Sequence, residues 1–190
     1  MSIQGSQTEK NLIKAFAGES QAKNRYTYFA KVAKEEGYVQ ISNIFTETAR
    51  HEESHAKQFV KFLEGGNVEI IATYPAQKIG TTVENLRNSI NNEKEEWTSL
   101  YKEFAEIADK EGYHKIAVKF KMIAKVEAEH EKRFTKLLQN IENNTVFERE
   151  KRTRWQCIKC GYVTEGNSAP EKCAACDHPR SYFQEYPENY

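Results

Sequence analysis

The feature that most constrains the fold of this chain is a Glu-x-x-His pair in a long helical segment that returns at an offset of 75 residues in a second such segment. The first pair is Glu52 and His55, and the second is Glu127 and His130. On a helix, side chains three residues apart lie on one face, so each pair presents a carboxylate and an imidazole in the same direction. Helical bundles build binuclear metal cores from such pairs. Because packing alone requires neither an acid nor an imidazole, the duplication indicates metal chemistry.

Helical periodicity dominates residues 6–142 and predicts four helices. Each helix would run for about 25–30 residues, or roughly 40 Å. Capping-box sequences at residues 6–9 and 81–84 mark the starts of the first and third helices. Gly37 and Gly112 are placed to end the first and third helices.

The four helices are expected to form two related hairpins. Residues 26–38 return as residues 101–113 at the same offset of 75, and both segments end in Glu-Gly-Tyr. Residues 65–80, which contain Pro75 and Gly80, are too many for a tight turn and predict a long crossover between the hairpins. Two helical hairpins joined by one crossover are a ferritin-like four-helix bundle. The predicted fold class is therefore mainly α.

Acidic residues interrupt the apolar stripe of each predicted helix near its middle. The stripes place Phe16 and Trp97 on the inward face. The acids found in these stripes are Glu19, Glu52, Glu93, Glu96 and Glu127. Burying carboxylates together without compensation is costly, and two divalent cations would supply that compensation. Oxygen ligands with one imidazole per metal favour iron or manganese over copper and leave zinc open.

The third helix breaks the repeat by one residue. The offset that relates the two Glu-x-x-His pairs sends Glu19 to Lys94 rather than to Glu93. We therefore predict a bulge or a local rotation in this helix, which leaves the orientations of Glu95 and Glu96 open. The remaining acids and histidines near the stripes are interpreted as surface residues: His51, Glu95, Glu103, Glu106, His114 and Glu129.

A second, smaller module follows the helices, and we place the boundary between domains 1–146 and 147–190. Cysteines in this module follow a Cys-x2-Cys, x12, Cys-x2-Cys pattern, formed by Cys157, Cys160, Cys173 and Cys176. Four thiolates on two such turns predict a tetrahedral site for zinc or iron, and the spacing does not choose between them. The neighbouring aromatic residues are expected to pack the module's core: Trp155, Tyr162, Tyr182 and Phe183.

Composition excludes several classes of partner. The net charge is zero, so no overall field attracts nucleic acid or an anionic membrane. The longest apolar run, near residues 70–72, is too short to span a bilayer, and the N-terminus lacks the pattern of a secretory signal. We therefore expect a cytoplasmic protein, in which cysteines bind metal more often than they form disulfides.

Taken together, these motifs resemble the rubrerythrin family over nearly the whole chain. The matching motifs are Gly18-Glu19, Glu-Gly-Tyr at 36–38, Glu52-x-x-His55, Glu93-x-x-Glu96, Glu127-x-x-His130, Cys157-x2-Cys160-Gly-Tyr and Cys173-x2-Cys176-x-His178-Pro179. The resemblance implies a ferritin-like di-iron domain followed by a rubredoxin-like domain with one iron on the four cysteines. Ala174 departs from the proline common in rubredoxin-type turns, which bears on redox potential rather than on metal binding.

The resemblance also implies a role for each ligand. Glu19 and Glu93 would be terminal ligands, and Glu52 and Glu127 would bridge the two irons. His130 would bind one iron. Glu96 and His55 would exchange on the other iron with oxidation state. Two tyrosines, Tyr26 and Tyr101, lie about two turns from the terminal acids and are interpreted either as hydrogen-bond donors to the bridging carboxylates or as core packing.

The implied activity is reduction of hydrogen peroxide to water, in protection against oxidative stress. Electrons would come from NAD(P)H through an electron-donor protein, a reductase or a rubredoxin, and would pass through the four-cysteine iron. The family resemblance further implies a head-to-tail homodimer, in which the tail of one subunit approaches the metal pair of the other. Two other functions remain open: an iron-storing ferroxidase, and a scaffold whose tail is a zinc ribbon.

Overall fold

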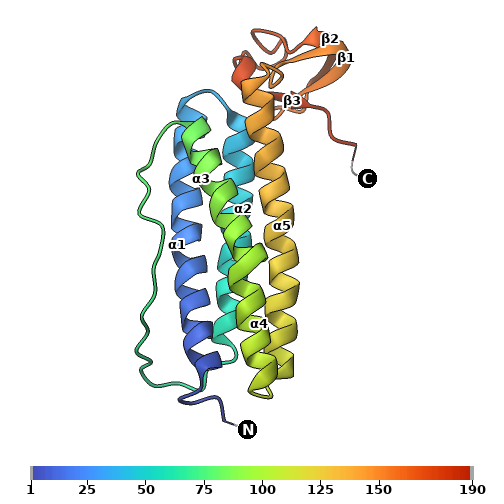
Figure 1. The fold of residues 1–190 in the computed structure, drawn as a ribbon. Coiled ribbons are helices and arrows are strands. Elements are labelled where there is room, and N and C mark those ends of the chain that lie inside the picture. The colour runs from blue at the N-terminus through green and yellow to red at the C-terminus, as the bar shows by residue number, and fades with distance from the viewer. Residues whose placement is uncertain (1, 189–190) are drawn as a thin grey trace.

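The computed structural model of this protein describes residues 2–188, and its helical part is a four-helix bundle. The helices are α1 (Gln7–Glu35), α2 (Val39–Val60), α3 (Thr82–Glu95) with its continuation α4 (Tyr101–Lys110), and α5 (His114–Glu142). A crossover of residues 61–81 runs along the outside of α1 (Figure 1). The predicted mainly α, ferritin-like architecture is confirmed.

The helix ends follow local sequence. At the start of α3, Thr81 and Glu84 form both hydrogen bonds of a capping box, as predicted. At the start of α1, the Ser6 side chain accepts a hydrogen bond from the Glu9 N–H, but the Glu9 carboxylate accepts from the Gly5 N–H at 2.7 Å instead of returning to Ser6. The helix is therefore capped by a variant of the predicted motif.

The two hairpins cap one another. The Glu36 carboxylate, where α1 ends, accepts a hydrogen bond at 3.0 Å from the N–H of Thr82, at the start of α3. The Glu111 carboxylate, where α4 ends, accepts bonds at 3.1 and 2.8 Å from the N–H groups of Gln7 and Thr8 in α1. These reciprocal contacts give the bundle a pseudo-twofold arrangement and satisfy N–H groups that a helix start leaves unpaired.

The bundle core consists of two aromatic clusters. One includes Phe59, Tyr101 and Phe120, and the other includes Tyr26, Phe45 and other apolar side chains. In each cluster the aromatic rings pack with centroids 5.0–6.3 Å apart. The acidic residues predicted from the sequence come from the middle of the same helices. The core therefore consists of two apolar clusters and one polar cluster.

Two residues predicted to be inward-facing are not. Phe16 is 37% exposed, and Ala15 takes the inward position with 1% exposure. One residue along a helix turns a side chain by about 100°, which is enough to exchange the two faces. Trp97 is also 37% exposed, and its indole N–H donates to Glu131 at 2.6 Å. Both predictions were wrong because these two positions lie out of phase with their stripes, whose other members, such as Leu12, Tyr26 and Tyr101, are buried as predicted.

The small module is a three-stranded antiparallel sheet at the end of the bundle where α5 terminates (Figure 1). Its strands are β1 (Glu148–Cys157), β2 (Val163–Ser168) and β3 (Phe183–Glu185), in the order β2-β1-β3. Trp155 and Phe183 are buried in its core, with Tyr162 and Tyr182 packed against them, as predicted. The boundary between residues 146 and 147 stays a prediction.

Candidate metal centres

Six side chains capable of binding metal meet in the middle of the bundle. They come from α1, α2, α3 and α5, and none is more than 8% exposed: Glu19, Glu52, His55, Glu93, Glu127 and His130. Each helix of the bundle thus contributes at least one carboxylate, as the interrupted stripes predicted. Burial of this many ionisable groups requires compensation by opposite charge.

The six side chains form two overlapping groups. One contains Glu19 and His55, the other contains Glu93 and His130, and both contain Glu52 and Glu127. Within each group, the ligand atoms all lie within 4.8 Å of one another. His55 Nδ1 is 2.9 Å from an oxygen of Glu127, and His130 Nδ1 is 2.8 Å from the other oxygen of the same carboxylate. Two cations with two carboxylates in common would require this arrangement.

Unpaired atoms in the cluster test whether it fits metal ions. Four carboxylates have buried oxygens without a hydrogen-bond partner: Glu19, Glu52, Glu93 and Glu127. His130 Nδ1 is close to several carboxylate oxygens but lacks hydrogen-bond alignment with them. Buried polar atoms are normally satisfied, so atoms that converge without bonding to one another indicate a missing common partner. Carboxylate oxygens with one imidazole in each group fit a pair of iron ions.

In the absence of metal, protons on the imidazoles balance the carboxylates. Burial opposes charge on His130, but the neighbouring carboxylates of Glu127 and Glu52 outweigh it and raise its pKa to about 12. Burial likewise opposes ionisation of Glu52, but the two neighbouring imidazoles, His130 and the hydrogen-bonded His55, outweigh it and lower its pKa to about 2. Burial, with the nearby charge of Glu52, raises the pKa of Glu93 to about 8. Cations entering the cluster would therefore displace protons from it.

Two tyrosines hold the acids that belong to only one group. The Tyr26 hydroxyl donates to Glu93, and the Tyr101 hydroxyl donates to Glu19. Each bond crosses from one hairpin to the other. The interpretation that the tyrosines contact the shared carboxylates was wrong. Glu52 and Glu127 point their oxygens toward the histidines of α2 and α5, which leaves Glu19 and Glu93 as the acceptors within reach.

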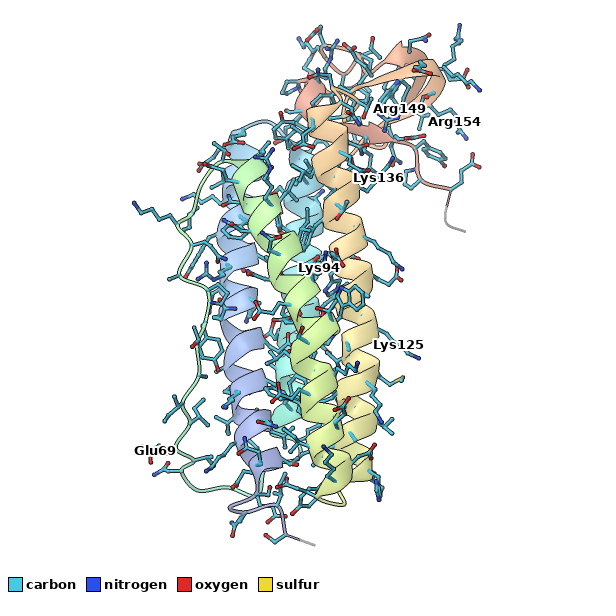
Figure 2. The ribbon with its side chains drawn as sticks, in the orientation of Figure 1. Glu69, Lys94, Lys125, Lys136, Arg149 and Arg154 are labelled. Atoms are coloured by element: carbon cyan, nitrogen blue, oxygen red, sulfur yellow. The ribbon has the colours of Figure 1, made fainter. Side chains whose placement is uncertain are left out.

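A π-helical turn at Glu96–Leu100 confirms the predicted irregularity of the third helix. Seven residues separate Glu19 from Tyr26, but eight separate Glu93 from Tyr101. The wider turn absorbs the extra residue, so Glu93 and Tyr101 both remain buried while Lys94 is exposed on the outer face (Figure 2).

The same turn settles the orientations that the sequence left open. Glu95 is exposed, whereas Glu96 is partly buried and faces a cavity beside Tyr101. Glu96 lies outside both ligand groups. Burial, with the charge of Glu19, raises its pKa well above the usual range. Glu96 therefore lies near the His55 group without belonging to it.

His51 was predicted to be a surface residue, and this was wrong. It is partly buried, its Nδ1 lies 3.1 Å from His130 Nε2, and the two rings stack within 10° of parallel. A group on the far nitrogen of a ligand histidine fixes its orientation and tautomer. The available signal was the position of His51, one helical turn before His55. The other surface predictions are confirmed, since the following are exposed: Glu95, Glu103, Glu106, His114 and Glu129.

The four cysteine sulfurs of the small module form a compact site. All lie within 4.8 Å of one another, and the Cys157–Cys176 and Cys160–Cys173 sulfur pairs are both 3.7 Å apart. A tetrahedral site with metal–sulfur bonds of about 2.3 Å has sulfurs roughly 3.8 Å apart. Against the effect of burial, backbone N–H groups lower the pKa of Cys173 to about 7, which favours a thiolate. The geometry therefore fits a tetrahedral metal.

The fold and the two sites define a class: a ferritin-like di-iron protein with a rubredoxin-like domain at its C-terminal end. Comparison with protein families agrees. The rubrerythrin family model matches residues 10–138 and 84–156, and the model for the rubrerythrin rubredoxin-like domain matches residues 155–184. This chain belongs to the rubrerythrin family. The metals of the family are a binuclear iron centre and one iron on four cysteines, which match the two sites.

Relatives match over the full length. A rubrerythrin of Porphyromonas gingivalis is 56% identical, with 100% of this chain and 94% of the relative covered. A rubrerythrin of Nitratidesulfovibrio vulgaris is 54% identical, with 96% of each chain covered. Among solved structures, mixed-valent nigerythrin covers 97% of this chain and 92% of its own, with a TM-score of 0.62 and 28% identity. Within residues 2–188, no helix has the length and apolar character needed to cross a membrane.

Proposed function

We propose that this chain is a non-haem di-iron peroxidase that reduces hydrogen peroxide to water. The observation that carries the proposal is the pair of buried ligand groups that have Glu52 and Glu127 in common. Two ferrous ions held by these residues would supply the two electrons that cleavage of the O–O bond requires. Relatives that are named rubrerythrin, and that match 100% and 96% of this chain, support this proposal.

The ligand roles follow from the grouping. Glu52 and Glu127 belong to both groups and are proposed as bridging ligands, whereas Glu19 and Glu93 belong to one each and are proposed as terminal ligands. His130 is the fixed imidazole of its group. His55 and Glu96 are proposed to exchange on the other metal: a neutral imidazole suits the ferrous state, and an anionic carboxylate suits the more positive ferric state. Structurally similar nigerythrin is described in mixed-valent, partially reduced and fully reduced states.

Other side chains orient ligands and carry protons. Tyr26 and Tyr101 hold the terminal acids by hydrogen bonds from their hydroxyls. Burial and the charge of Glu19 raise the pKa of Glu96, and this carboxyl group is proposed to pass a proton to a departing oxygen. The aromatic clusters on the same helices keep bulk water from the centre.

Electrons are proposed to arrive through the four-cysteine iron. Along α5, His130 is separated from the helix end at Glu142 by about 18 Å. This separation supports a head-to-tail homodimer, in which the rubredoxin-like domain of one subunit approaches the metal pair of the other. A reductase or rubredoxin linked to NAD(P)H would be the external donor. Four cysteines grouped as one metal site rather than paired as disulfides suit a reducing cytoplasm, where we propose a role in protection against oxidative stress.

The activity is tested with the iron-loaded, chemically reduced chain. One equivalent of hydrogen peroxide should oxidise the iron pair, with two electrons consumed per peroxide. The change in visible absorption measures this oxidation. Iron storage would instead appear as Fe(II) oxidised by oxygen and accumulated far beyond the bound sites. A colourless oxidised protein would indicate zinc rather than iron on the cysteines.

The relay is tested by replacing Cys157 and Cys160 with serine. We expect turnover with a reductase to be abolished, because electrons no longer reach the metal pair, while a single oxidation of the prereduced pair by peroxide is retained. Full steady-state turnover in this variant would refute the relay and leave the peroxidase proposal intact.

A further inference from the structure

A cavity of about 330 Å³ lies beside the His55 half of the metal cluster. Its walls come from α1, from crossover residues 71–75 and from the third helix, and Glu96 and Tyr101 are among them. Because the Tyr101 hydroxyl donates to Glu19, one side chain connects the cavity wall to the ligand group. The cavity therefore adjoins the half of the centre where we propose ligand exchange.

The volume of the cavity is larger than hydrogen peroxide requires. A molecule of two oxygen atoms occupies little more than one or two water sites, each about 30 Å³. The cavity volume of about 330 Å³ lies at the lower end of the range for pockets that hold small organic molecules. An organic group attached to a peroxide would therefore have space here.

The chemistry of the walls suits a molecule with an apolar body. Ala72, Leu100 and Phe104 contribute carbon surface, while the acidic and basic side chains among the lining residues are those of Lys14, Glu95, Glu96 and Glu103. The acids outnumber the one lysine, so an organic anion would be repelled more than a neutral hydroperoxide. The lining thus favours an uncharged molecule over an anion.

The outer wall is held in place by the crossover. The Tyr74 hydroxyl donates to the carbonyl of Lys14 at 2.9 Å, and Arg25 donates to the carbonyl of Gln77 at 3.1 Å and to that of Pro75. Figure 2 shows the crossover outside α1, with Glu69 projecting away from the bundle. The segment is therefore hydrogen-bonded to α1 at two places, which holds the outer wall of the cavity in position.

Building on the proposed function, we propose that this cavity binds alkyl hydroperoxides and that the chain reduces them as well as hydrogen peroxide. The alkyl group lies against Ala72 and Phe104, and the hydroperoxide end lies toward Glu96. In the reaction the O–O bond breaks, and two electrons, one from each ferrous ion, are taken up with two protons. The oxygen attached to carbon leaves as an alcohol, and the outer oxygen leaves as water.

Two leucine variants of α1 distinguish the effect of filling this cavity from the general effect of adding a leucine to the helix. A Cβ added at Gly18 would have Tyr74 Cε1, at 3.8 Å, as its nearest neighbour, so Gly18→Leu can be accommodated and fills the cavity. Leucine also favours a helix more than glycine does, so the variant is expected to fold. The control is Asn24→Leu, an exposed position on the same helix that does not line the cavity.

The experiment uses the full-length, iron-loaded chain and two readouts. Calorimetric titration of the oxidised protein with 2-phenylpropan-2-ol, the alcohol formed from cumene hydroperoxide, should show one site per chain. Gly18→Leu should weaken this binding at least tenfold, and Asn24→Leu should not change it. In stopped-flow oxidation of the reduced protein, Gly18→Leu should lower the ratio of the cumene hydroperoxide rate to the hydrogen peroxide rate at least tenfold.

The outcomes distinguish the two proposals. If the wild-type chain reacts with hydrogen peroxide but neither binds the alcohol nor reacts with cumene hydroperoxide, the cavity proposal is overturned and the peroxidase proposal stands. If both variants retain the wild-type affinity and rate ratio, the organic molecule binds elsewhere and the cavity proposal is again overturned. If neither peroxide oxidises the iron pair, the proposed function fails and the cavity proposal fails with it.

Discussion

The two halves of the metal cluster come from equivalent parts of a repeat, yet their surroundings differ. His130 is backed by His51, whose ring stacks on it at a centroid distance of 5.3 Å. The position equivalent to His51 in the second hairpin is Val126, which is 37% exposed and supplies no imidazole to His55. Conversely, Glu96 follows Glu93 by three residues, whereas the residue three after Glu19 is Ala22.

This difference in surroundings is the basis for proposing separate tasks for the two halves. The repeat supplies each half with a terminal acid, an imidazole and the two carboxylates in common. The added histidine contacts the imidazole of one half, whereas the added glutamate and its cavity adjoin the other half, where ligand exchange and substrate binding are proposed. Similar ligand sets can thus hold two metals to different degrees, because neighbouring groups decide how firmly a ligand is oriented.

The largest effect is expected where the two halves have a ligand in common. Glu127→Ala removes a carboxylate from both groups, so both ions of the cluster should be lost. Peroxidase activity should fall by more than about a hundredfold, which exceeds the loss expected when a residue that only orients a ligand is replaced. Metal analysis and the visible spectrum measure this, and the cysteine-bound iron serves as an internal reference. Glu129→Ala, an exposed position on the same helix, is the control. Full iron content in Glu127→Ala would refute the common ligand.

A smaller effect is expected from the open half alone. Glu96→Gln keeps the shape of the side chain but removes its acid, so oxidation of the reduced chain by peroxide should slow by about a hundredfold while the ferrous ions stay bound. Stopped-flow absorbance measures the rate, and Glu95→Gln, an exposed neighbour, is the control. Equal rates in the two variants would remove Glu96 from the mechanism.

The closed half should respond to loss of its backing imidazole. His51→Leu leaves the ligands in place but frees the orientation of His130, so the affinity of one metal should fall by about tenfold. Titration of the metal-free chain with ferrous iron measures two successive affinities, only one of which should change. His114→Leu replaces an exposed histidine and should change neither. A loss shared equally by both metals would contradict the distinction between the halves.

The smallest effect concerns pH in the metal-free chain. The raised pKa of Glu93, about 8, and that of His130, about 12, mean that the folded cluster binds more protons than the unfolded chain does. Stability is therefore full at low pH and is lost as the pH rises from 5 to 9. The lowered pKa of Glu52, about 2, acts only in more acidic solution.

Thermal unfolding of the metal-free chain should therefore shift downward by on the order of 5 °C across this range. The iron-loaded chain should show a slope of the opposite sign, because metal binding displaces protons and strengthens with pH. Melting curves for both forms between pH 5 and 9 provide the measurement. Parallel slopes would mean that protons do not take the place of cations in the cluster.

Much of the cluster could be predicted from local pattern. The buried acids and both ligand histidines follow from their positions in helical stripes, and the π-helical turn follows from a one-residue mismatch in the repeat. Phe16 and Trp97 were placed one residue out of phase, because a broad apolar stripe leaves neighbouring positions nearly equivalent. A charged or ligating residue defines a helical face more sharply than an apolar one.

The sequence by itself determined which side chains lie at the metal layer, because the period of a helix is a property of the segment alone. Only the tertiary structure decided which hairpin each tyrosine bonds to, that His51 stacks on His130, and that the crossover encloses a cavity next to Glu96. These contacts join helices whose relative rotation and height depend on the packing of the whole bundle. The pattern within one helix cannot specify them.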